Sequence, residues 1–255
     1  MIKLFVTDLD GCISYPFKTP KWNNINKIRD LNLKSRSDEL IPPLSVCTGR
    51  PYPYAEAVSQ WLDIRLPFVF ESAGLYHWDG NLIETALENS DEDLKPIFTI
   101  KDWIRESILP KYPTTNLEFT KMMDAGIVSP NKDIIKEILP LVHDKISSDF
   151  PELEVHATDI SINILMNGNN KLQGMKLLAN ALNITLDEIA YIGDTGGDIP
   201  ALEKVKMPFS PSNATHGVKN VSRNIDAETS DAVLIAYDEI IRYNRSLREE
   251  TAKEA

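Results

Sequence analysis

The chain has 255 residues and a formal net charge of −11, and 42% of its residues are hydrophobic. This length allows one large domain or two smaller ones, with enough apolar residues for a sizeable core. The negative charge argues against nucleic acid or an anionic membrane as a partner, because both attract basic surfaces. No run of about 18 apolar residues is present, Asp8 and Asp10 interrupt the N-terminal apolar run, and the two cysteines offer no disulfide framework. We therefore expect a cytoplasmic protein.

The first third of the chain alternates short apolar runs with segments of helical spacing. Strands are expected at residues 3–7, 41–47 and 67–70, and helices at residues 22–33 and 54–62. Two apolar segments flank the turn Asp79-Gly80 and predict a hairpin over residues 75–84. This alternation predicts a parallel sheet covered by helices on both faces.

The middle of the chain has a different pattern, bounded by polar breaks at residues 89–93 and 167–170. Helices are expected at 98–109 and 131–147, each followed by strands, within 116–128 and 154–166. Alternation then resumes, with helices beginning at 171, 199 and 237 and strands at 189–192 and 206–210. We therefore expect an α/β fold in which a doubly wound parallel-sheet core, residues 1–85 and 166–255, is interrupted by an α+β domain at residues 86–165.

Four polar clusters lie where a predicted strand ends or a helix begins. They are Asp8 with Asp10, Thr48-Gly49-Arg50, Lys171, and the segment GDTGGD at 193–198. In open α/β sheets ligands bind beyond the carboxyl ends of the strands, so the fold would gather these side chains at one edge. Several carboxylates suit Mg²⁺, and hydroxyl and ammonium groups beside a carboxylate nucleophile suit phosphoryl transfer.

Each cluster alone has an ordinary structural explanation. Asp and Gly after a strand commonly form a turn, and Thr or Asp at a helix start commonly caps it. A single lysine is usually solvated at the surface. Only the four clusters together, in this order and at these positions, indicate phosphoryl-transfer chemistry.

The sequence resembles the haloacid dehalogenase superfamily in these same residues. DLDG at 8–11, CTGR at 47–50, Lys171 in NNKLQGMKLL, and GDTGGD at 193–198 are similar to its four motifs. The insert at 86–165 resembles the cap domain of the Cof-type (class IIB, C2-capped) phosphatases. The resemblance implies a Rossmann-like core, a cap that closes over it, and a Mg²⁺-dependent phosphatase acting on a small phosphate monoester such as a sugar phosphate or sugar-acid phosphate.

The acids of the first and fourth motifs receive their roles from this resemblance. Asp8 would be the nucleophile and a metal ligand, and Asp10 the general acid and base, with its backbone carbonyl on the metal. Asp194 would ligate Mg²⁺. Asp198 would hold a metal-bound water or orient Lys171.

The remaining motif residues are expected to bind substrate. Thr48, Lys171 and the backbone at Gly49 would hold the phosphate group. For Arg50 two readings stay open: contact with the substrate beside the phosphate, or a salt bridge to an acid of the core.

Two positions depart from the family pattern. Cys12 stands where Thr or Ser is usual, and Gly197 stands where Asn is usual. The second change removes a polar contact, which puts catalytic efficiency in question more than the type of reaction. Two other functions stay open: a phosphomutase with the same machinery, and a phospho-accepting regulatory domain without turnover.

Overall fold

The computed structural model describes residues 1–16, 18–85 and 91–254. The chain forms two compact units: Met1–Glu84 with Asn170–Ala255, and Thr85–Asn169. The polar break expected at 89–93 falls partly on residues 86–90, which lie outside the described residues. The first unit contains all four motif clusters.

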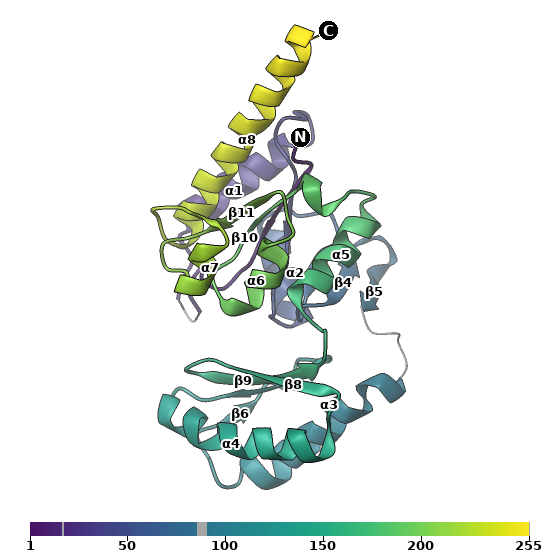
Figure 1. Ribbon diagram of the computed structural model, residues 1–255, viewed down its shortest axis with the longest axis vertical. Helices are drawn as coiled ribbons and strands as arrows, with labels where there is room; N and C mark the ends of the chain where they lie inside the picture. The colour runs from purple at the N-terminus through teal and green to yellow at the C-terminus, as the bar shows by residue number, and fades with distance from the viewer. Residues whose placement is uncertain (17, 86–90, 255) are drawn as a thin grey trace. The chain divides into compact units, whose positions relative to one another are not determined.

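The first unit is built on a parallel five-stranded sheet in the order β12-β11-β10-β1-β2 (Figure 1). Its strands are β1 (Leu4–Thr7), β2 (Leu44–Val46), β10 (Ile189–Ile192), β11 (Met207–Ser210) and β12 (Arg223–Asn224). The chain order reverses its direction across the sheet at β1, which leaves β2 on one side and β10 to β12 on the other. The predicted α/β class with a doubly wound parallel sheet is confirmed.

Helices cover both faces of this sheet (Figure 1). They are α1 (Trp22–Lys34), α2 (Tyr52–Trp61), α5 (Lys171–Ala181), α6 (Ile199–Leu202), α7 (His216–Asn220) and α8 (Thr229–Glu254). Because successive side chains of a strand point to opposite faces, Leu4 and Val6 join the core cluster that includes Met175 of α5. Phe5 points the other way and packs edge-on against Tyr237 of α8, with 5.0 Å between the ring centroids.

A small second sheet follows β2 in the chain and meets the main sheet at a parallel bridge between Cys47 and Val69. It contains β3 (Phe68–Phe70), β4 (Gly74–His77) and β5 (Leu82–Thr85) in that order, and β3 pairs antiparallel with β4. The turn between β4 and β5 is a short 3-10 segment, η1 (Asp79–Asn81), in which Gly80 has φ +77°. That backbone conformation suits glycine, so the Asp79-Gly80 signal located the turn correctly.

The second unit is an α+β domain with a four-stranded antiparallel sheet in the order β6-β7-β9-β8. Its elements are α3 (Asp91–Trp103), which continues into the π-helical turn η2 (Ile104–Ile108), β6 (Asn116–Leu117), β7 (Asp124–Val128), α4 (Lys132–Asp149), β8 (Leu153–Ala157) and β9 (Ser161–Met166). Isoleucines of both helices, such as Ile100 and Ile138, pack with Ile127 and Ile164 of the strands in one core. The unit therefore has a hydrophobic core of its own.

Two further findings concern the helices. The closing helix expected at 237–248 begins earlier, at Thr229, because Ala232, Val233 and Ala236 already form its buried face. Among the described residues, no helix is long and apolar enough to span a bilayer.

Candidate active site

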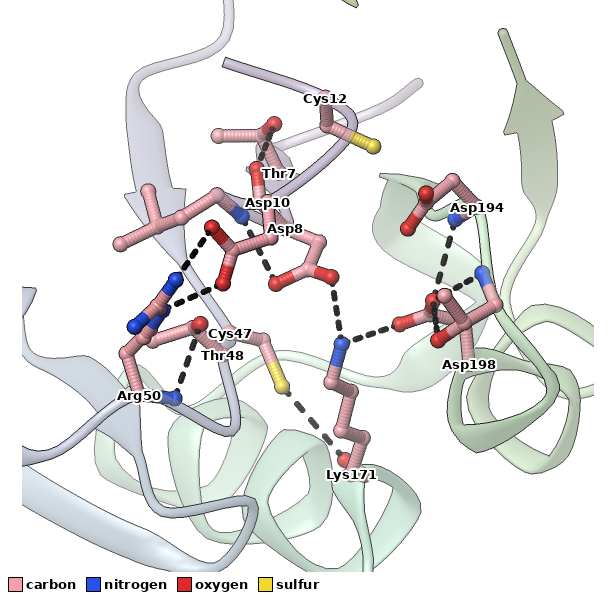
Figure 2. A network of polar contacts seen from close by, with 12 residues as sticks. Thr7, Asp8, Asp10, Cys12, Cys47, Thr48, Arg50, Lys171, Asp194 and Asp198 are labelled. Atoms are coloured by element: carbon pink, nitrogen blue, oxygen red, sulfur yellow. Dashed lines mark hydrogen bonds and ion pairs between the residues drawn. The ribbon is translucent and has the colours of Figure 1, made fainter. Parts of the chain in front are cut away.

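The first motif follows β1 at the carboxyl edge of the sheet. Thr7 is in register with Val46 of β2 and Ile192 of β10, so the three strands end side by side. Asp8 continues this alignment, since its N–H donates to the Ile192 carbonyl at 3.0 Å. The sheet therefore places Asp8 next to the segments that follow β2 and β10 (Figure 2).

Asp8 is 5% exposed, and both oxygens of its carboxylate have donors. Oδ1 accepts from the N–H of Leu9 at 2.7 Å, and Oδ2 lies 2.8 Å from the ammonium of Lys171. A fixed, desolvated carboxylate beside a cation is the arrangement that a carboxylate nucleophile needs.

Lys171 is the first residue of α5. Asn170 caps this helix, since its side-chain oxygen accepts from the N–H groups of Leu172 and Gln173. The Lys171 ammonium lies between two carboxylates, 2.8 Å from Asp8 and 2.5 Å from Asp198. Although burial alone lowers the pKa of Lys171, Asp198 and Asp8 raise it well above its usual value. The side chain therefore carries a positive charge at the centre of the site.

Asp198 is fully buried, and its carboxylate accepts from five donors. Oδ1 accepts from Lys171 and from the hydroxyl of Tyr191, and Oδ2 accepts from the N–H of Asp194 and from the N–H and hydroxyl of Thr195. Burial alone raises the pKa of Asp198, but Lys171 and the other donors bring it below its usual value. Asp198 is thus a stable anion whose oxygens are all engaged within the protein.

Asp194 is different, because its Oδ1 is buried and has no hydrogen-bond partner among the described residues. Its Oδ2 lies so close to the loop after β1 that a Cβ on Gly11 would be 1.9 Å from it. Gly11 also has φ +72°, so both the backbone and the neighbouring carboxylate require glycine there. The side chain of Asn213 fixes the same loop by donating to the Gly11 carbonyl at 3.0 Å.

The three acids form a potential cation site. One oxygen from each of Asp8, Asp194 and Asp198 lies within 4.8 Å of the others. Burial, and then the charge of neighbouring acids, raise the pKa of Asp194 to about 8, while burial raises that of Asp8 to about 7 against the opposing effect of Lys171. Raised values on two adjacent carboxylates, one with a buried unpartnered oxygen, indicate that the site lacks positive charge. Hard oxygen ligands of this kind fit Mg²⁺.

The second motif contributes Thr48 and Arg50 from the loop after β2. The Thr48 hydroxyl accepts from the N–H of Arg50 at 3.2 Å, and Thr48 itself is buried. The Arg50 guanidinium binds the carboxylate of Asp10 with two contacts, Nε to Oδ2 at 2.5 Å and Nη2 to Oδ1 at 3.0 Å (Figure 2). Of the two readings of Arg50 from the sequence, the structure shows the salt bridge to a core acid.

The two cysteines are buried packing residues that donate weak hydrogen bonds. Cys12 contacts the Ile192 carbonyl at 3.7 Å, and Cys47 contacts the Lys171 carbonyl at 3.8 Å. Burial raises the pKa of both thiols. Neither has the thiolate character that reactive cysteines need.

The sheet edge thus gathers the side chains that the motifs predicted, with Asp10 turned to Arg50. Sequence reasoning missed Tyr191, because a tyrosine in the apolar run IAYI reads as a core residue. Its position three residues before Asp194 on β10 was a usable signal, since a buried tyrosine hydroxyl needs a partner.

Comparison with known proteins agrees with this geometry. A family model described as haloacid dehalogenase-like hydrolase matches residues 75–236. The chain belongs to this family. A phosphoglycolate phosphatase from Methanothrix thermoacetophila is 24% identical, over 88% of this chain and 90% of the relative. Another, from Sulfolobus acidocaldarius, is 21% identical over 93% and 95%. The chain is accordingly a phosphatase, that is, a phosphoric monoester hydrolase.

Solved structures show the same fold. A crystal structure from Thermoplasma acidophilum superposes with a TM-score of 0.75 at 19% identity, covering 94% of this chain and 98% of the other. The sucrose-phosphatase from Synechocystis, solved with sucrose and phosphate, has a TM-score of 0.66 at 14% identity, with 94% and 98% covered. At these identities the similarity concerns the fold.

Proposed function

We propose that this phosphatase hydrolyses a small organic phosphate monoester, a sugar phosphate or sugar-acid phosphate, through a phosphorylated Asp8. The observation that best supports this proposal is the buried Asp8 carboxylate at the end of β1, whose Oδ2 lies 2.8 Å from the ammonium of Lys171. Among relatives that match most of the chain, names such as phosphoglycolate phosphatase support a small phosphate ester as substrate.

Each residue then has a defined task. An oxygen of Asp8 attacks phosphorus, and the bond from phosphorus to the ester oxygen breaks as Asp10 gives that oxygen a proton. Asp10 then removes a proton from the water that hydrolyses the Asp8 phosphate. Lys171 and the Thr48 hydroxyl donate to the phosphate oxygens, and Asp198 holds Lys171 in place.

The acid cluster fits a magnesium ion. Asp8, Asp194 and the backbone carbonyl of Asp10 would hold it, because Oδ1 of Asp194 is buried and has no hydrogen-bond donor among the described residues. When bound, Mg²⁺ would neutralise charge on the phosphate and on the attacking carboxylate. Asp198, whose oxygens accept from five donors, would contribute through Lys171 rather than by direct coordination.

Metal removal tests this proposal. We expect EDTA to abolish hydrolysis of a panel of phosphate monoesters and Mg²⁺ to restore it. Ca²⁺ should support it poorly, because its looser coordination misplaces the reacting groups. In calorimetric titrations, Asp194→Asn should weaken Mg²⁺ binding, whereas Asp30→Asn, at an exposed position on α1, should not. Full activity after exhaustive chelation would rule out the metal-dependent mechanism.

We further propose that the unit Thr85–Asn169 is the cap of this phosphatase. It is supported by the compact core of this unit and by its position in the chain between the second and third motifs. Limited proteolysis should cut near residues 167–170, and orthovanadate with Mg²⁺ should slow that cut. First cleavage within residues 182–192 would contradict these boundaries.

A further inference from the structure

Arg50 lies in the loop after β2, beside the carboxylate of Asp10. Its guanidinium binds both oxygens of the Asp10 carboxylate, at 2.5 and 3.0 Å. The side chains of this pair are 23% and 30% exposed, whereas those of Lys171 and Asp8 are 7% and 6% exposed. The pair therefore faces solvent at the margin of a buried phosphate site.

The surroundings of Arg50 fix its backbone and orient its guanidinium. Its N–H donates to the Thr48 hydroxyl, and its carbonyl accepts from the N–H of Glu71 at 2.9 Å. The guanidinium lies over the ring of Tyr54, 5.0 Å from the centroid. An arginine held in this way presents its planar fork to a carboxylate, the anion for which that geometry is best suited.

The two cations of the site differ in what they can bind. Lys171 is buried between Asp8 and Asp198, and in the proposed function it binds the phosphate. Arg50 contacts Asp10, the residue proposed to protonate the ester oxygen. A group attached next to that oxygen therefore comes within reach of Arg50. A carboxylate at this position of the substrate would replace the Asp10 carboxylate on the guanidinium, so Arg50 would still form one ion pair.

We propose that Arg50 recognises a carboxylate on the leaving group, so that this phosphatase prefers phosphate esters of hydroxy acids over those of neutral alcohols. The inference rests on the proposed function, because it takes Asp10 as the residue beside the ester oxygen. Exchange of partners also couples specificity to catalysis: the carboxylate that binds Arg50 releases the side chain of Asp10 toward the ester oxygen.

Three two-carbon esters test it: 2-phosphoglycolate, 2-hydroxyethyl phosphate and 2-aminoethyl phosphate, whose leaving groups are anionic, neutral and cationic. Wild-type kcat/KM should fall in that order, by roughly 10- to 100-fold between the first two, the range that charged hydrogen bonds contribute. Arg50→Gln should remove most of that preference. Arg50→Lys should restore part of it, because it keeps the charge and loses the fork.

Arg65→Gln is the matched control, since Arg65 is an exposed arginine that pairs with Asp63 and lies over the ring of Trp78. It should leave the order of the three esters unchanged. Wild-type enzyme that is indifferent to leaving-group charge, or an Arg50→Gln variant that loses the same factor on all three esters, would overturn the inference. Metal-dependent turnover of p-nitrophenyl phosphate by the same preparations would show that the proposed function survives that outcome.

Discussion

Removing the hydroxyl of Tyr191 separates the structural and catalytic contributions of the network around Asp198. Tyr191 is fully buried on β10, and its hydroxyl donates to the same Asp198 oxygen that binds Lys171. Tyr191→Phe keeps the ring and its packing and deletes one hydrogen bond to a charged acceptor. Such bonds contribute about 1.5–3 kcal/mol, so we expect the free energy of unfolding to fall by that amount.

Tyr237→Phe provides the comparison within the same unit. Tyr237 is also fully buried, and its hydroxyl donates to the Pro42 carbonyl at 2.5 Å, a neutral acceptor. Loss of that bond should cost about 0.5–1.5 kcal/mol. Urea unfolding of the two variants, followed side by side and extrapolated to water, measures the difference.

Activity gives the second measurement. In Tyr191→Phe, Oδ1 of Asp198 loses the hydroxyl donor and keeps the Lys171 ammonium, which should draw Lys171 away from Asp8 and from the phosphate. We expect kcat/KM to fall about tenfold, equivalent to about 1.4 kcal/mol, and inorganic phosphate to bind more weakly. Tyr237→Phe should leave both unchanged. Equal destabilisation by the two variants, together with unchanged phosphate binding by Tyr191→Phe, would refute the reasoning.

Four further predictions concern the motif residues and Cys12. Gly197→Asn should leave turnover unchanged or raise it, since a Cβ there meets only the Thr195 hydroxyl at 3.9 Å; a large loss in a folded variant would contradict this. Asp8→Asn should abolish turnover of every ester. Asp10→Asn should slow phosphorylation of Asp8 by alkyl phosphates by roughly 10²–10⁴-fold, and phosphorylation by p-nitrophenyl phosphate much less. Single-turnover experiments measure both rates. Equal losses for the two esters would show that Asp10 is not the general acid. Both buried thiols should resist a thiol-specific disulfide reagent until the protein unfolds, and rapid labelling of native protein would contradict their packing.

The backbone of the site was predictable from the sequence because buried parallel strands are short apolar runs with abrupt polar ends. The strand at 189–192 was located to the residue, and the first strand to within one. Once strand ends are known, the parallel topology brings the following residues to one edge. The two-residue strand β12 and the five-residue helix α7 were missed, because elements this short carry no measurable periodicity.

Side-chain pairing was less predictable, because a motif gives the position of a residue and not the direction of its side chain. The sequence left Arg50 with two partners, and only the structure shows the bidentate contact with Asp10. It likewise suggested two roles for Asp198 and none for Tyr191. These contacts join residues from distant parts of the chain, such as Lys171 and Asp198, so local patterns do not determine them.

Hydrogen-bond donors explain why three neighbouring aspartates differ. Asp198 receives five donors, and its pKa falls despite complete burial. Asp8 and Asp194 share the same buried surroundings with fewer donors, and burial raises their pKa. Hydrogen-bond donors of the protein therefore stabilise the negative charge of Asp198, whereas Asp8 and Asp194 have too few donors to stabilise theirs equally. A divalent cation would supply the positive charge that Asp8 and Asp194 lack, and this difference from Asp198 is the reason for proposing the metal site at those two acids.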